Sequence, residues 1–179
     1  MKRIFRGISS KTGKWVAGSL YIGINDNGKE YLAIIVPTIT KLDKKVDDEN
    51  SVIFNDDEFH VIKYNSAGQY LLDDKNDIPI YEGDIVIQSY KVKTRNVYGK
   101  MTENEVELEG FHIGVAKLTT EGTQLCSLKH FDSEGNLAEN QPHKNSRQQI
   151  RSYRSKVIGN IFENPYLLKL KQLTNEIYK

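Results

Sequence analysis

Four glutamates on alternating positions constrain the fold of this chain more than any other feature. They are Glu103, Glu105, Glu107 and Glu109. A period of two places all four carboxylates on one face of a β-strand. Like charges in a row repel each other, so this face must be in water or be matched by basic side chains on a neighbouring strand. The segment therefore predicts a strand with one wet, acidic face.

The apolar pattern that follows these glutamates is displaced by one residue. Leu108 lies between two glutamates, at an even position. Phe111 and Ile113 lie at odd positions, the set that the glutamates occupy before them. A glycine within a strand often marks a bulge, so the change predicts a bulge or bend near Gly110.

Much of the remaining chain predicts further strands joined by turns. Segments rich in aromatic and β-branched residues span 4–8, 15–24, 30–36, 59–64, 69–72, 85–92, 123–131 and 157–162. Asn27-Gly28 is typical of a two-residue hairpin, in which both central residues need a positive φ. Between residues 43 and 58, seven acids face only two lysines, which indicates a solvated excursion.

The end of the chain predicts a helix over residues 165–179. Asn164 can cap it, and Pro165 suits the first helical position. An apolar stripe follows, formed by Leu167, Leu168, Leu170, Leu173 and Ile177. Such a short helix is marginal alone and must dock on the sheet or on another subunit. The predicted fold is mainly β, a barrel-like or twisted antiparallel sheet assembly with a short C-terminal helix.

Composition excludes several classes of function. The net charge of +1 provides no global field that would steer the 179-residue chain to nucleic acid or a membrane. No apolar run approaches the roughly 20 residues that cross a bilayer. Cys126 is the only cysteine, which excludes an internal disulfide and a cysteine-based zinc cluster. These features predict a cytosolic protein without a cofactor or a bound metal.

Catalytic motifs are also missing from the sequence. It has no nucleophile elbow, no phosphate-binding glycine motif and no histidine pair at the spacing of a zinc site. Glu82 and Asp84 offer one alternative, a carboxylate pair for acid–base chemistry. The sequence otherwise predicts no enzyme activity and no catalytic residue.

Nucleic acid is the most specific partner that the residues suggest. The basic segment, residues 143–156, contains no acid. Its candidate contact residues are Lys144, Arg147, Arg151, Tyr153, Arg154 and Lys156. In a helix, the three arginines would share one face, and Lys91, Lys93 and Arg95 could join them in space. The segment could instead be a solvated loop, or contact the glutamate row of another subunit.

Two motifs carry a family resemblance. One runs from Gly68-Gln69-Tyr70 through Asp73 and Asn76 to Tyr81-Glu82-Gly83-Asp84-Ile85-Val86. The other is Lys156-Val157-Ile158-Gly159-Asn160-Ile161-Phe162-Glu163-Asn164-Pro165. In order and spacing they resemble the YopX family of phage and prophage proteins, in which tyrosine is usual at position 162. The resemblance implies one β-rich domain over residues 1–164, or two closely packed sub-barrels within it, followed by the 165–179 helix.

The function implied by this resemblance is that of a phage or prophage accessory protein, whose molecular activity the family does not define. The shared positions look like a fold signature, in which Asp84 bonds backbone N–H groups at a turn. We therefore expect a non-catalytic, self-associating interaction or regulatory module in the bacterial cytoplasm, with a host or phage protein as a further partner. The alternative is a nucleic-acid-binding protein that uses the basic segment.

Overall fold

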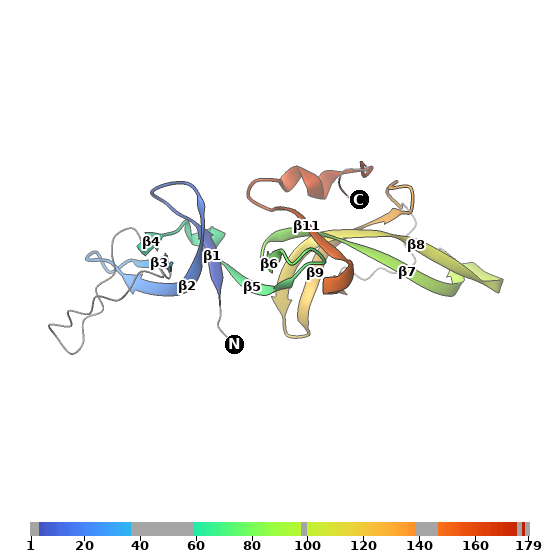
Figure 1. Ribbon diagram of the computed structural model, residues 1–179, viewed down its shortest axis with the longest axis horizontal. Coiled ribbons are helices and arrows are strands. Elements are labelled where there is room, and N and C mark those ends of the chain that lie inside the picture. The colour runs from blue at the N-terminus through green and yellow to red at the C-terminus, as the bar shows by residue number, and fades with distance from the viewer. Residues whose placement is uncertain (1–3, 37–58, 98–99, 139–146, 175–176, 178–179) are drawn as a thin grey trace. The chain divides into compact units, whose positions relative to one another are not determined.

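A computed structural model describes residues 4–36, 59–97, 100–138, 147–174 and 177 (Figure 1). The chain divides into two compact units, Met1–Tyr70 and Leu71–Lys179. Strands make up 64% of the described residues, in two antiparallel sheets, which confirms the mainly β class. The acidic excursion at 43–58 lies outside the described residues. A single domain over residues 1–164 stays a prediction.

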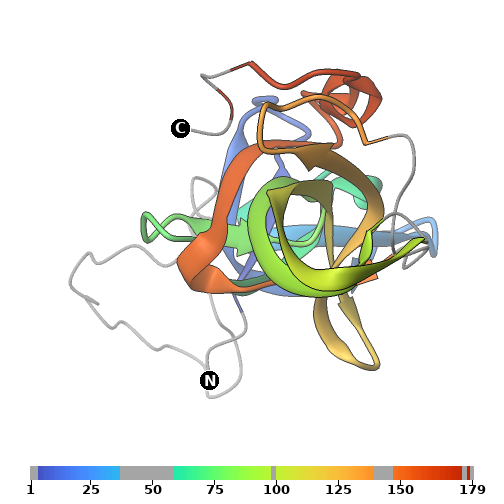
Figure 2. The same ribbon diagram turned by 90° about the vertical axis from the view of Figure 1, so that its right-hand side faces the viewer.

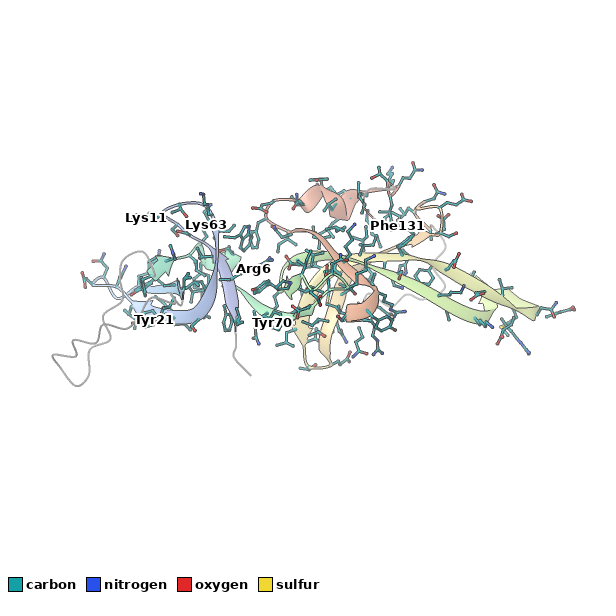
Figure 3. All side chains as sticks on the ribbon, in the orientation of Figure 1. Arg6, Lys11, Tyr21, Lys63, Tyr70 and Phe131 are labelled. Atoms are coloured by element: carbon teal, nitrogen blue, oxygen red, sulfur yellow. The ribbon has the colours of Figure 1, made fainter. Side chains whose placement is uncertain are left out.

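Unit 1 is an antiparallel sheet of short strands. It contains β1 (Phe5–Ile8), β2 (Trp15–Ile24), β3 (Glu30–Ile35), β4 (Phe59–Val61), the 3₁₀ helix η1 (Tyr64–Ser66) and the start of β5 (Gly68–Asp73). The strands lie in the order β4-β3-β2-β1-β5. Its buried apolar side chains are Ile8, Ala33, Ile34 and Ile62. Figure 3 labels Arg6, whose guanidinium carbon lies 4.5 Å from the centre of the Trp15 ring.

The hairpin between β2 and β3 corrects one prediction. Gly28 has the expected positive φ of 73°, but Asn27 does not share it. Asn25 instead closes a longer turn, because its side-chain oxygen accepts hydrogen bonds from the backbone N–H groups of Asn27 and Lys29. The loop is therefore longer than a two-residue hairpin turn. It is stabilised by the side chain of Asn25, which is not part of the Asn-Gly pattern.

Unit 2 contains the end of β5, followed by β6 (Pro79–Tyr81), β7 (Asp84–Val97), β8 (Lys100–Thr119), β9 (Gly122–Asp132), β10 (Arg147–Gln149), the 3₁₀ helix η2 (Ser152–Arg154), β11 (Ser155–Asn160) and the 3₁₀ helix η3 (Pro165–Lys169). Its main sheet has the order β10-β9-β8-β7-β11. The predicted strands are confirmed with ends shifted by a few residues. The short strands β6 and β10 were not predicted.

The main sheet of unit 2 is strongly curved, as Figure 2 shows, but it is not a closed barrel. Its edge strands β10 and β11 form no ladder with each other among the described residues. One core cluster includes Val86, Ala116 and Leu125. A second surrounds Phe131, which Figure 3 labels and which is fully buried. The barrel-like alternative is thus replaced by an open, twisted sheet.

The predicted C-terminal helix is much shorter than expected. Asn164 and Pro165 begin η3, but the helix is of the 3₁₀ type and ends at Lys169. The chain then becomes extended, and its residues 171 and 173 exchange backbone hydrogen bonds with residues 137 and 135 of the turn after β9. The leucine stripe is used within unit 2, because Leu167 and Leu173 are buried in the Phe131 cluster.

The family motifs form turns that hold β11 in place. Asp74 is only 2% exposed, and its carboxylate accepts hydrogen bonds from the N–H groups of Asn76, Ile78 and Val157. Asp and Asn are typical turn residues, but the bond from this turn to β11 was not predicted from the sequence. A Cβ atom on Gly159 would lie 2.6 Å from the side-chain oxygen of Asn164, so this position requires glycine.

We predict that Asp74→Ala destabilises the protein strongly. Three backbone N–H groups would lose a charged acceptor, and such bonds contribute about 1.5–3 kcal/mol each. The free energy of unfolding, measured by urea titration, should fall by about 2–4 kcal/mol. The matched control is Asp73→Ala, because only the backbone oxygen of Asp73 accepts the hydrogen bond from Ser152. Equal stability of the two variants would contradict this account of the turn.

Candidate interaction surface

The most distinctive part of unit 2 is a two-stranded arm. We define it as residues 91–97 of β7 and 100–109 of β8. The pairing of β9 with β8 begins at Gly110, and the pairing of β11 with β7 reaches only Gln88. Among the described residues, the strands of the arm therefore pair only with each other. Figure 1 shows this hairpin projecting from the sheet of unit 2 beyond β9 and β11.

One face of the arm is charged. Lys91 lies opposite Glu109, and Lys93 lies opposite Glu107. Glu103 and Glu105 continue the alternation along β8, and all four glutamates are exposed. The predicted wet, acidic row is confirmed in that all four carboxylates are exposed, and lysines of β7 lie opposite Glu107 and Glu109. Glu103 and Glu105 lie beyond the pair Thr94–Val106, after which the register of the two strands shifts.

The opposite face of the arm is apolar. Val92 lies opposite Leu108, and Val106 lies opposite Thr94. Val92 is 43% exposed, while Val106 and Leu108 are half-buried. A hairpin of two strands has no third strand and no packed layer of its own that could bury such side chains. The arm consequently presents an apolar strip to its surroundings.

The predicted bend near Gly110 does not occur. The ladder between β7 and β8 runs without a shift from the Ile85–Val115 pair to the Thr94–Val106 pair. One irregularity lies instead between β8 and β9 at residues 113–115, opposite Ser127, which has a positive φ of 54°. A second lies in the arm, where the β7–β8 register shifts between Thr94 and Asn96. Glu109 and Phe111 share one face of β8. The surroundings of that face change from water to core between these two residues, whereas the alternation of side chains along the strand continues unchanged.

A short ion pair holds the base of the arm. The Lys91 Nζ atom lies 3.1 Å from Glu107 Oε1 and 3.7 Å from Glu109 Oε2. The hydrogen bond to Glu107, and then the negative charges of Glu107 and Glu109, raise the pKa of Lys91 above its ordinary value. Both partners are well exposed, so this pair contributes more to orientation than to stability.

The basic segment is not a helix. Arg147 lies on β10, Arg151 precedes η2, Tyr153 and Arg154 lie in η2, and Lys156 lies on β11. The condition under which the three arginines would share a helical face is therefore not met. Arg147 and Arg151 are exposed, Arg154 is half-buried, and Lys156 donates a hydrogen bond to the carbonyl oxygen of Ile177 at 3.5 Å. Lys144 lies outside the described residues.

The buried side chain of Gln88 determines this conformation. Its Nε2 atom donates to the carbonyl oxygen of Gln149 at 3.2 Å, and its Oε1 atom accepts from the Arg151 N–H at 2.7 Å. The Ser155 hydroxyl lies 2.9 Å from the same oxygen. Gln88 is fully buried. A glutamine on β7 thus satisfies backbone groups that a helix would have paired internally.

An open cavity of about 480 Å³ brings the arm and the basic segment together. Lys91 and Glu109 line it from the arm, and Tyr153 and Arg154 line it from η2. Tyr153 is 75% exposed, and its ring centre lies 5.9 Å from the guanidinium carbon of Arg154. Lys91 therefore lies near the η2 part of the basic segment, which the sequence analysis allowed as one arrangement. Lys93 and Arg95 lie further out on the arm and do not line the cavity.

A ring stack lies beneath the cavity, and sequence reasoning missed it. Tyr90 stacks on His112 with ring centres 4.4 Å apart, and His130 meets His112 edge-on at 4.5 Å. A Cβ atom on Gly110 would lie 2.9 Å from the Tyr90 hydroxyl and 2.2 Å from the carbonyl oxygen of Phe131. Gly110 therefore makes room for the stack. The feature that could have revealed the stack is the presence of Tyr90, Gly110 and His112 on two strands that pair with each other.

The acidic pair Glu82 and Asp84 serves the backbone. Glu82 accepts a hydrogen bond from the N–H of Leu118 at 3.0 Å. Asp84 is 1% exposed and accepts from the N–H of Tyr81 at 2.8 Å, as the turn interpretation predicted. The described residues contain no cluster of three or more side chains that could bind a metal, and among them no helix has the length and hydropathy of a membrane span.

A family model described as YopX protein matches residues 4–169. The chain belongs to the YopX family. No curated protein and no solved structure matches it. The motifs that first indicated the YopX family contain the turn residues Asp74, Gly83, Asp84, Gly159 and Asn160. The arm and most of the basic segment lie outside these motifs.

We predict that the raised pKa of Lys91 depends on Glu107. Glu107→Gln removes the charge and the charge-assisted hydrogen bond, so the pKa of Lys91 should fall towards its ordinary value. An NMR titration of the lysine side-chain signals would measure this change. Glu103→Gln is the control, because Glu103 forms no ion pair with Lys91. An unchanged Lys91 pKa in Glu107→Gln would show that the arm is not paired in this register.

Proposed function

We propose that this YopX-family protein is a non-catalytic interaction or regulatory module that self-associates through the arm. In this proposal it is an accessory protein encoded by a phage or prophage, and it acts in the cytoplasm of the bacterial host. A host or phage protein is a second class of partner. The observation that carries the proposal is the arm, whose strands pair only with each other among the described residues.

The unpaired edges of the arm favour a protein partner. An edge strand presents a row of N–H and C=O groups that can pair with another chain. A two-stranded hairpin is only marginally stable in water without a further layer. The ion pairs of Lys91 are exposed and contribute little to the stability of the arm. A partner that covers the arm would supply the layer that the chain itself lacks.

The apolar strip favours the same conclusion. Val92, Val106 and Leu108 lie on one face of the arm, opposite the charged face. Apolar surface gains about 25 cal/mol per Å² when it is removed from water, so a partner on this strip would be stabilising. The leucines of the C-terminal tail cannot serve this purpose, because Leu167 and Leu173 are already buried in unit 2.

The absence of catalysis in this proposal is supported by what the acidic side chains do. Asp74, Glu82 and Asp84 accept hydrogen bonds from backbone N–H groups. A carboxylate that accepts such hydrogen bonds stabilises the backbone of the turn. The glutamates of the arm, in contrast, are exposed and alternate along a strand. This arrangement is suited to contact with a partner and not to acid–base chemistry.

We predict that Val92→Lys and Leu108→Lys weaken self-association. Each places a charge on the apolar strip, where a partner would have to desolvate it. Light scattering after size exclusion should show a discrete oligomer for the wild type and a dissociation constant raised by about tenfold or more in each variant. The control is Ile24→Lys, which charges another apolar side chain, 73% exposed, in unit 1. A monomeric wild type would overturn the proposed function.

A second candidate function is nucleic-acid binding by the basic segment. The observation that favours it is Tyr153, which is 75% exposed beside Arg154 at the rim of the cavity. Base stacking on an aromatic ring with an adjacent arginine is typical of single-strand binding. The glutamate row opposes it, because Glu109 lines the same cavity and would repel a phosphate.

For this second candidate we predict that Tyr153→Ala weakens binding to a fluorescent single-stranded oligonucleotide. Loss of one stacking contact costs about 1–3 kcal/mol, or roughly 5- to 150-fold in affinity. Fluorescence anisotropy at several salt concentrations would measure the affinity and its salt dependence. Tyr64→Ala is the control, because Tyr64 is 63% exposed on unit 1. Equal affinities of the two variants, or no binding by the wild type, would exclude the basic segment as the site.

A further inference from the structure

Unit 2 carries two surfaces of opposite charge that are not paired with each other. The first is the outer half of the glutamate row, Glu103 and Glu105, which are exposed and form no ion pair within the described part of the chain. The second consists of Arg147 and Arg151, which are also exposed and for which no ion pair is found among the described residues. The two glutamates and the two arginines are therefore available to a partner.

The fold keeps these two surfaces apart within one chain. The base of the row reaches the basic segment, because Glu109 and Arg154 line the same cavity. From there β8 carries Glu107, Glu105 and Glu103 successively further along the arm, at about 6.7 Å for every two residues. The outer glutamates lie on the projecting hairpin of Figure 1, while Arg147 is held on β10 by its pairing with β9.

We propose that the partner of the outer glutamate row is the basic segment of a second copy of this chain. Glu103 and Glu105 of one copy would face Arg147 and Arg151 of the other, and a two-fold axis would repeat this contact. This inference rests on the proposed function, because it names the surfaces through which self-association is oriented. The apolar strip then supplies affinity, and the charges fix which way the arm lies.

The alternatives fit the charges less well. A nucleic acid on Arg147 and Arg151 would leave Glu103 and Glu105 without partners. A basic host protein on the glutamate row would leave the arginines without partners. A second copy satisfies both surfaces at once, with two carboxylates for two guanidinium groups in each contact.

The decisive experiment is a charge swap between copies. The first variant is Glu103→Arg/Glu105→Arg, which leaves the partners of Lys91 in place. The second is Arg147→Glu/Arg151→Glu, which changes only exposed side chains. Alone, each variant would place like charges in both contacts, so its dissociation constant should rise by about tenfold or more. Sedimentation velocity at low and high salt would measure it, after circular dichroism has verified folding.

Mixing the two variants should restore association, because one contact then joins an arginine row to a glutamate patch and the other joins a glutamate row to an arginine patch. A single chain that carries all four substitutions should also associate. The control is Asp26→Arg/Glu30→Arg, which makes the same change of charge on exposed residues of unit 1. It should leave association unchanged.

The outcomes separate this inference from the function on which it rests. Loss of association in each variant, with recovery in the mixture, supports the charge contact. If both variants associate like the wild type while Val92→Lys does not, self-association stands and the charge contact is wrong. If both variants lose association and the mixture does not recover, the two surfaces do not face each other. A monomeric wild type overturns both proposals.

Discussion

The ladder between β7 and β8 is the interaction on which unit 2 depends. It begins in the core, where Ile85 pairs with Val115, and continues without a register shift to Thr94 and Val106 on the arm. A side-chain period of two means that one register fixes the facing of every residue along this length. The same ladder therefore places Ile87 and Ile113 in the core and joins Lys91 to Glu109 in water.

This continuity explains what the sequence could and could not predict on β8. The alternation of glutamates correctly placed their carboxylates on one face, because that inference needs only the geometry of a strand. The bend expected at Gly110 was wrong, because it assumed that each face keeps one environment along its whole length. The face that carries Glu109 enters the core at Phe111, and the sequence does not record where neighbouring strands end. Gly110 is instead required by Tyr90 and the carbonyl group of Phe131.

The conformation of the basic segment could not be predicted for a related reason. The spacing of its arginines would place them on one face of a helix, but nothing within the segment decided between a helix and a solvated loop. The deciding group is Gln88, more than sixty residues earlier, whose buried amide bonds the backbone at Gln149 and Arg151. Local periodicity cannot reveal a long-range polar anchor of this kind. The C-terminal tail shows the same limit. Its leucine stripe correctly predicted docking, but at residues 171 and 173 its backbone pairs with the turn after β9 instead of continuing the helix.

The YopX motifs and the proposed interaction surface divide the chain between two tasks. Asp74 and Asp84 satisfy backbone N–H groups at turns, and Gly159 gives room to Asn164, so these positions specify the fold. Specificity for a partner has to come from side chains that the fold does not consume. On unit 2 these include the outer glutamates, the apolar strip of the arm and the exposed arginines. Because the β7–β8 ladder and Gln88 hold these groups in place, a partner would meet surfaces that are already oriented, and little ordering cost would be subtracted from the binding free energy.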